Sequence, residues 1–166
     1  GSIRLVEKYS IYTKRIAQRG ELLTHDSDQA VLTLLKVSDV IENDFSPVEI
    51  DDTLGRLVEV VSESSRNIFP VLDSKGRFQG YVSLEDIRKD MFRYDQYETL
   101  HVFNFMRSAT EYVYEDEKMD SVMKKFETTS AWNLPVVRHD RTYLGFVSKS
   151  MIFSAYRDEL KLVSQD

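Results

Sequence analysis

The stretch PVLDSKGRFQGYVSLEDI at residues 70–87 decides the fold, because the chain carries a second version of it. Residues 135–152, PVVRHDRTYLGFVSKSMI, repeat it at a constant offset of 65 residues without a gap. Six of the 18 aligned positions are identical, where average residue usage would give about one by chance. They are the proline, two valines, glycine, serine and isoleucine of the pattern PV…GxVS…I. A repeat of this length predicts two copies of one structural unit.

Each copy has the same expected order of elements. A short strand precedes an acidic segment suited to a helix N-terminus, and an apolar stripe with the spacing i, i+3, i+4, i+7 then predicts a helix. Two apolar strands joined by a turn follow, and a closing helix opens at Leu84 or Lys149. The unit is therefore β-α-β-β-α. The residues concerned are Val48, Asp51–Thr53, Leu54, Leu57, Val58, Val61, 69–72 and 78–83 in the first copy, and Val113, Asp116–Glu117, Met119, Val122, Met123, Phe126, 134–137 and 143–148 in the second.

These elements predict a mixed α/β fold of the α+β class. One copy alone has too little apolar core to be stable, so we expect the two repeats to pack together about a pseudo-twofold axis. We place the first repeat at residues 37–100 and the second at residues 101–160. Residues 3–36 form a linker ahead of them, residues 161–166 form a C-terminal tail, and Gly1-Ser2 is expected to be a cloning remnant.

The composition excludes several classes of protein. The chain has 166 residues with 42% hydrophobic and 30% charged side chains, which is typical of a globular protein and not of a collagenous or disordered one. It has 0 cysteines, so a disulfide framework, a thiolate zinc site and a cysteine nucleophile are excluded. No apolar run is long enough to cross a membrane, so we expect the chain to be soluble. The net charge of −6 argues against a nucleic-acid partner.

Charge is unevenly distributed along the chain. Residues 3–20 carry five basic side chains against the single acidic Glu7, a local charge of +4, which leaves −10 for the remainder. One interpretation is a solvated flank. The other is a juxtamembrane segment, because the cytoplasmic flanks of membrane helices carry excess lysine and arginine. Composition alone does not decide between them.

The repeated unit resembles the CBS domain. The resemblance lies in SRNIFPVLD at 65–73 and GRFQGYVSLEDI at 76–87, and again in WNLPVV at 132–137 and YLGFVSKSMI at 143–152. The stretches YSIYTKRIAQRG at 9–20 and FVSKSMIFSAYR at 146–157 add a resemblance to the cytoplasmic tail of bacterial chloride channel (CLC) family proteins. That second resemblance implies a membrane domain in the same polypeptide, a basic juxtamembrane linker at 3–36, and a place on the cytoplasmic side of the cell membrane. It also leads us to expect a homodimer.

CBS pairs commonly bind adenine nucleotides in the cleft between the copies, and the resemblance implies such a site here. The family motif, Gly-x-hydrophobic-Ser/Thr-x-x-Asp, is complete in the first copy at residues 80–86. A helix N-terminus and a serine hydroxyl suit phosphate oxygens, and a carboxylate can accept two hydrogen bonds from a ribose diol. In the second copy Met151 replaces the aspartate, so we expect at most one intact site. The nucleotide-binding residues carried over from the family are Ser83, Asp86, Thr110, Tyr112, Ala131, Trp132 and Asn133.

Several of these residues also have a purely structural interpretation. Ser83 and Asp86 have the spacing of a helix capping box. Trp132 could stack on an adenine, or it could form a hydrophobic plug between the copies. Lys124 and Lys149 could meet phosphates, although a solvated lysine is the simpler interpretation of both.

No feature of the sequence predicts an enzyme or a metal site. The three histidines lack ligand spacing, and the Thr24–Asp28 segment suits a turn and a helix cap better than a metal loop. The leading hypothesis is therefore a cytoplasmic regulatory module of a chloride channel or transporter that senses ATP, ADP or AMP and requires no cofactor. A second hypothesis is a structural dimerisation pair with a vestigial cleft. A third is the regulatory pair of another transporter or of an enzyme.

Overall fold

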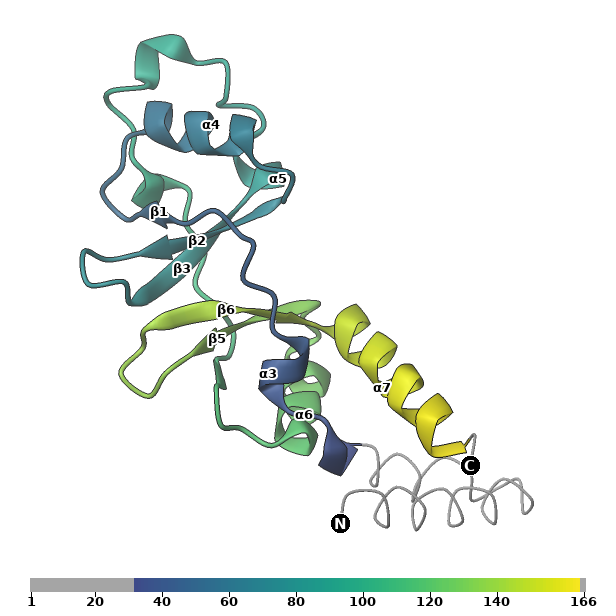
Figure 1. Ribbon diagram of the computed structural model, residues 1–166. Coiled ribbons are helices and arrows are strands. Elements are labelled where there is room, and N and C mark those ends of the chain that lie inside the picture. The colour runs from purple at the N-terminus through teal and green to yellow at the C-terminus, as the bar shows by residue number, and fades with distance from the viewer. Residues whose placement is uncertain (1–31, 165–166) are drawn as a thin grey trace. The chain divides into compact units, whose positions relative to one another are not determined.

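The computed structural model of the protein describes residues 32–164 (Figure 1). The expected cloning remnant, most of the basic linker, the Thr24–Asp28 segment and the end of the C-terminal tail lie outside the described residues. The chain divides into two compact units. The first comprises residues up to Ile41, Asp116–Asn133 and the residues from Val147 on, and the second comprises Glu42–Glu115 and Leu134–Phe146.

The first repeat has the predicted order of elements. The three strands form one sheet in the order β1-β2-β3, with β1 parallel and β3 antiparallel to β2. A parallel pair needs a long crossover, which α4 supplies, whereas the antiparallel pair needs only a turn. The elements are β1 (Val48–Glu49), α4 (Leu54–Glu63), β2 (Ile68–Leu72), β3 (Phe78–Ser83) and α5 (Leu84–Ile87).

The second repeat follows the same order, so the predicted mixed α/β fold with two β-α-β-β-α repeats is confirmed. Its elements are β4 (Val113–Tyr114), α6 (Met119–Thr129), β5 (Asn133–Val137), β6 (Tyr143–Ser148) and α7 (Lys149–Ser164). α3 (Val37–Val40) lies at the start of the first repeat, ahead of β1, and two short 3₁₀ helices, η1 (Tyr94–Gln96) and η2 (Val102–Asn104), lie between α5 and β4. None of the helices within residues 32–164 is long and apolar enough to cross a bilayer.

Apolar residues at the predicted helical spacing form the cores. In α4 the residues at i, i+3 and i+7 share one face, and all three are buried. The equivalent face of α6 buries Met119, Val122 and Phe126, whereas Met123 is only half-buried. The core cluster of the first repeat consists of Val48, Leu54, Leu57, Val61, Phe69, Val71, Val82, Ile87 and Val102.

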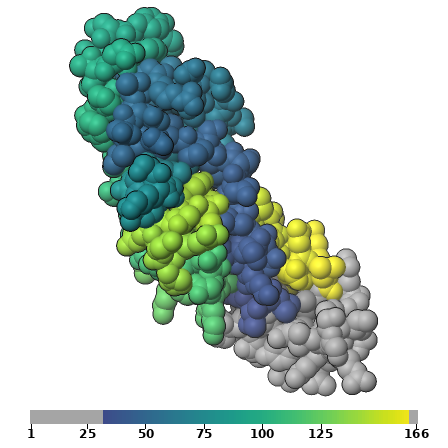
Figure 2. Space-filling model, turned by 60° about the vertical axis from the view of Figure 1, so that its left-hand side comes forward, coloured from purple at the N-terminus to yellow at the C-terminus, as the bar shows by residue number. Residues whose placement is uncertain are grey.

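Isolated backbone bridges repeat with the same 65-residue offset as the sequence. Glu42 pairs with Phe146 on β6, and Arg107 pairs with Tyr81 on β3. The two pairs are equivalent with the repeats exchanged, so each repeat adds its leading segment to the sheet of the other. Figure 2 shows the first of these segments, in dark blue, against the yellow-green of β6. The bridges Lys36–Lys118 and Thr53–His101 form a second reciprocal set, as the predicted pseudo-twofold relation requires.

An aromatic cluster joins the two sheets inside the second unit. The ring centroid of Phe78 lies 5.8 Å from that of Tyr112 and 6.2 Å from those of Tyr143 and Phe146. Offset and edge-to-face contacts at these distances are favourable beyond the area they bury. The Tyr143 hydroxyl is buried without a hydrogen-bond partner among the described residues, and this burial raises its pKa.

The helix starts agree with expectation in the first repeat and differ from it in the second. Thr53, the last residue of the segment Asp51–Thr53, is the N-cap residue of α4, whereas the N-cap residue of α6 is Lys118 and not Asp116 or Glu117. The Thr53 hydroxyl accepts a hydrogen bond from the Arg56 amide at 3.2 Å, whereas Lys118 makes no side-chain cap. The closing helices begin at Leu84 and Lys149 as predicted, but α5 spans 4 residues and α7 spans 16.

Candidate functional site

Ser83 and Asp86 lie at the junction of β3 and α5. Ser83 ends β3 and is the N-cap residue of α5, yet its hydroxyl makes no cap hydrogen bond. The capping-box interpretation of this pair is therefore wrong. The expected phosphate site at a helix N-terminus is also weakened, since a helix of one turn has little macrodipole.

The Asp86 carboxylate is paired with Arg107. Arg107 Nε donates to Asp86 Oδ2 at 2.5 Å and Nη2 donates to Oδ1 at 2.8 Å, which is the two-pronged geometry of the strongest arginine–carboxylate pairs. The Asp86 side chain is 23% exposed and the Arg107 side chain 61% exposed. The hydrogen bond that Arg107 donates to Asp86 raises the pKa of Arg107 above its ordinary value. The site is thus a half-buried carboxylate covered by an exposed guanidinium.

The position of Arg107 is set by the edge of β3. Its amide donates to the Tyr81 carbonyl at 2.8 Å, and the Tyr81 amide donates back to the Arg107 carbonyl at 2.9 Å. Gly80 permits this approach, because a Cβ atom there would lie 2.5 Å from the Arg107 carbonyl oxygen. Real Cβ atoms do not come that close to backbone, so the repeated glycine serves packing at this edge.

The second repeat lacks these features at the equivalent junction. Ser148 Oγ accepts a hydrogen bond from the Met151 amide at 3.1 Å, so this serine caps its own helix. Met151 occupies the position of Asp86 and cannot replace a carboxylate as an acceptor. Glu42 occupies the position of Arg107. The hydroxyl, the carboxylate and the guanidinium therefore occur together only in the first repeat.

Glu42 belongs to a separate charged cluster. Arg66 Nη2 donates to Glu42 Oε2 at 2.9 Å and to Asp44 Oδ1 at 2.5 Å, and the Arg66 guanidinium lies 4.3 Å from the ring centroid of Phe45. The Arg66 hydrogen bond holds the pKa of Asp44 below its ordinary value. The segment 42–45, which is equivalent to 107–110, thus makes side-chain contacts with Arg66 inside the protein.

Thr110 and Tyr112 lie just ahead of β4 and outside the strand itself. Thr110 is exposed. Tyr112 is half-buried, with its ring edge-on to Phe78 and the Arg141 guanidinium 4.2 Å from its centroid. The structure gives Tyr112 a packing role, and its contact with a nucleotide stays a prediction.

Ala131, Trp132 and Asn133 belong to the first compact unit. The Trp132 side chain is 72% exposed, so the ring is not a buried plug. Its carbonyl accepts a hydrogen bond from the Lys149 amide at 2.9 Å, and Lys149 Nζ lies 5.5 Å from the ring centroid. Lys149 is therefore a cation above an aromatic face and not simply a solvated lysine. Ala131 donates its amide to Thr129 Oγ1, and Asn133 begins β5.

The family model described as CBS domain matches the chain twice, at residues 37–93 and 102–158. The chain belongs to the CBS domain family. The two matches contain the two repeats found from the 65-residue offset, so the chain is a tandem CBS pair.

Two relatives and one solved structure place this CBS pair among others. The chain is 25% identical over 119 residues to the uncharacterized protein MJ1004 of Methanocaldococcus jannaschii, over 68% of this chain and 52% of that protein. It is 25% identical over 128 residues to a homoserine O-acetyltransferase of Methanosarcina acetivorans, over 77% of this chain and 23% of that protein. The chain thus spans about half and about a quarter of these relatives. A CBS domain pair/ACT domain protein of Thermotoga maritima superposes with a TM-score of 0.59 at 25% identity, over 75% of this chain and 98% of that one.

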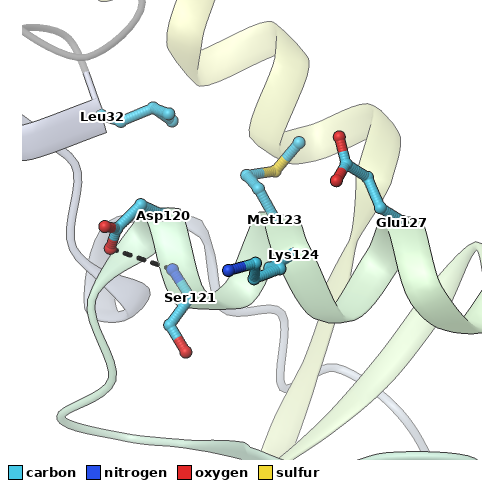
Figure 3. Close-up of a pocket in the computed structure, with 6 residues that line it drawn as sticks. All are labelled: Leu32, Asp120, Ser121, Met123, Lys124 and Glu127. Carbon is cyan, nitrogen blue, oxygen red and sulfur yellow. Dashed lines mark hydrogen bonds between the residues drawn. The ribbon is translucent and has the colours of Figure 1, made fainter.

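Lys124 lies in the lining of a hollow on the first unit. The hollow is lined by Leu32 and by the outer face of α6, including Asp120 and Glu127 (Figure 3). The lining is mixed in charge and carries one backbone-to-carboxylate hydrogen bond, from the Ser121 amide to Asp120 at 2.9 Å. Lys124 points along this CBS helix with acidic neighbours, which suits a solvated lysine.

One acidic group lies near β1. Carboxylate oxygens of Glu49, Asp51 and Asp52 lie within 4.8 Å of one another. The Asp52 carboxylate accepts a hydrogen bond from the Glu49 amide at 2.8 Å, so its position is explained by the turn that this hydrogen bond closes. The carboxylates carry no further argument for a metal.

Arg107 is the residue of the candidate site that the sequence did not indicate. It lies 21 residues from Asp86, so no local spacing connects the two. The 65-residue offset does align Arg107 with Glu42, at the start of each CBS repeat. A difference in charge at that position is the one signal in the sequence that marks it.

Proposed function

We propose that this CBS pair is a regulatory module that binds an adenine nucleotide, ATP, ADP or AMP, at the β3–α5 junction of the first repeat. The observation that carries the proposal is the difference between the repeats. In the first, the Ser83 hydroxyl is not used for capping and lies three residues before a carboxylate paired with an exposed guanidinium. In the second, the serine caps its helix and methionine replaces the acid.

The three groups match the parts of a nucleotide. The Asp86 carboxylate can accept hydrogen bonds from a ribose diol, and the Ser83 hydroxyl and Arg107 can donate to phosphate oxygens. Nothing in this set is a nucleophile or a general base with a partner, so the proposed role is binding and not catalysis.

We propose further that the pair regulates a chloride channel or transporter as part of the same polypeptide, on the cytoplasmic side of the membrane. Support comes from the resemblance of residues 9–20 and 146–157 to CLC tails and from the +4 charge of residues 3–20. Regulation requires that the nucleotide bind one conformation more tightly than another, since equal affinity shifts no equilibrium. Chloride flux through vesicles holding the full-length protein should change with nucleotide on the cytoplasmic face. An unchanged flux at saturating nucleotide would contradict this host.

The binding test uses the single tryptophan. Titration with ATP, ADP and AMP, followed by Trp132 fluorescence and by calorimetry, should show saturable binding. Asp86→Ala should weaken it about tenfold or more, because a charged hydrogen-bond acceptor is lost. Glu85→Ala is the matched control, since Glu85 is adjacent, 75% exposed and paired with Arg88 at the surface. Absence of heat at millimolar nucleotide, or equal effects of the two variants, would reject the site.

A structural dimerisation module is the second candidate. The Arg66 cluster favours it: Glu42, at the position equivalent to Arg107, and Asp44 are both paired with Arg66 and so serve internal contacts. Sedimentation measurements across a concentration series distinguish the two roles. A dimer whose affinity is independent of nucleotide, with no nucleotide bound, would support the structural role.

A further inference from the structure

We propose that Arg107 makes the first-repeat site selective for phosphorylated ligands, because it occupies the carboxylate that a ribose diol must reach. This inference rests on the proposed nucleotide site and specifies which class of ligand that site selects. A nucleoside has only neutral hydroxyl groups with which to displace Arg107 from its two-pronged ion pair with Asp86. A nucleotide supplies a phosphate to Arg107 as its diol reaches Asp86, so both charges keep a partner.

The contact geometry supports the competition. Arg107 meets both oxygens of Asp86, at 2.5 and 2.8 Å, which covers the edge of the carboxylate that a diol would use. With Arg107 in place the Asp86 side chain is only 23% exposed, so a ligand that displaces Arg107 must itself supply the donors that the carboxylate loses. Arg107 itself is 61% exposed and keeps further N–H donors, and an anion in solvent can therefore reach it.

The ion pair is not needed for the fold at this edge. The second repeat forms the same backbone bridge, Glu42 to Phe146, with no charged pair between the positions equivalent to 86 and 107. An ion pair with one partner this exposed also adds little stability, about 0.2–1 kcal/mol in typical cases. The pair is therefore an addition to the first repeat, which favours a role in ligand choice over a role in holding the sheet.

The backbone of Arg107 stays in place while its side chain moves. Two hydrogen bonds hold it to Tyr81, and Gly80 lets residues 106 and 107 lie close against β3. Exchange of Asp86 for a phosphate thus requires rotation about side-chain bonds only. Gly80→Ala would push this segment away and disturb the pair, as its Cβ would meet the Arg107 carbonyl oxygen at 2.5 Å.

The test compares AMP with adenosine. In the unsubstituted protein AMP should bind at least about tenfold more tightly than adenosine, and Arg107→Met should reduce that ratio by about tenfold or more. The reduction should come from both sides, with weaker AMP binding and tighter adenosine binding. Arg88→Met is the matched control, because it removes an exposed arginine paired with Glu85 and should leave the ratio unchanged.

Opposite outcomes separate this inference from the nucleotide site itself. If Asp86→Ala abolishes AMP binding but Arg107→Met leaves adenosine binding unchanged or weaker, Arg107 does not compete and the inference fails alone. If neither AMP nor adenosine binds the unsubstituted protein, both proposals fail.

Thermal unfolding of each variant checks the fold, and Arg107→Lys serves as a second variant that keeps the charge but loses the two-pronged contact. It should give an intermediate ratio; a ratio equal to that of the unsubstituted protein would overturn the inference.

Discussion

At the scale of single residues, two hairpin turns carry the same backbone but different side chains. Gly76 has φ 79° and Arg141, 65 residues later, has φ 76°. Glycine adopts this left-handed region freely, whereas other residues lose roughly 1–2 kcal/mol there because Cβ crowds a carbonyl oxygen. Arg141 is held in place by its turn hydrogen bond to Arg138 and by its contact with the Tyr112 ring.

We expect Arg141→Gly to be more stable than Arg141→Ala by about 1 kcal/mol in urea unfolding. Both variants lose the guanidinium contact with Tyr112, so their difference isolates the backbone strain. Gly76→Ala, where a Cβ meets nothing within 4 Å, should lose a similar amount and is the reciprocal control. Equal stability of the two Arg141 variants would show that the turn relaxes.

At the scale of elements, the helices α4 and α6 begin with the same backbone but different caps. Thr53 and Lys118 are equivalent N-cap residues, both with φ −73° and an extended ψ. Thr53 accepts from the Arg56 amide, and Lys118 makes no such hydrogen bond. A lysine here also places positive charge at the positive end of the helix.

Lys118→Thr should therefore raise the free energy of unfolding by about 0.5–1 kcal/mol. Lys118→Ala removes the same charge without supplying a cap and should gain only a few tenths. Thr53→Ala should lose about 1 kcal/mol in the other repeat. Denaturant midpoints with unchanged slopes provide the measurement, and a Lys118→Ala variant as stable as Lys118→Thr would contradict the capping argument.

At the scale of the whole molecule, the segment that enters the first repeat joins both sheets of the second unit. Glu42 pairs by its backbone with Phe146 and by its side chain with Arg66, which also holds Asp44. Phe45 adds a ring 4.8 Å from that of Phe146. This cluster replaces the acid and guanidinium of the first-repeat site with contacts internal to the protein.

The pH dependence of this cluster follows from Asp44. Its folded pKa is held below 3.8 by the Arg66 hydrogen bond, so the stabilisation is present above the unfolded value and is lost as pH falls through the folded value. Arg66→Met should return the pKa of Asp44 toward its ordinary value in an NMR titration. Asp140 is an internal control, because its pKa is lowered by Thr142 and not by Arg66. A pKa of Asp44 that stays low in the variant would contradict the assignment.

The fold was largely predictable because its signal is local and occurs twice. The spans of β3 and β6 and the starts of α5 and α7 match the prediction, since alternating and helical apolar patterns depend on near neighbours. The cap of α4 lies in the predicted segment, but that of α6 was mispredicted, because backbone geometry places Lys118 and not the acidic Asp116 or Glu117 at the N-cap position. The sequence predicts where α5 starts but not its length, because one apolar turn looks the same as the start of a long helix.

The sequence by itself determined the two-repeat architecture, the buried helix faces and the loss of the acid at Met151, because residue type and spacing decide these. Only the tertiary structure decided what Asp86 contacts. Arg107 lies 21 residues away and reaches Asp86 through a backbone bridge between repeats that no local pattern encodes. The same bridge in the second repeat brings Glu42 to β6 and leaves its charge to Arg66. One backbone arrangement, used twice, thus places the Asp86–Arg107 pair of the proposed ligand site in one repeat and the Glu42–Arg66 ion pair in the other.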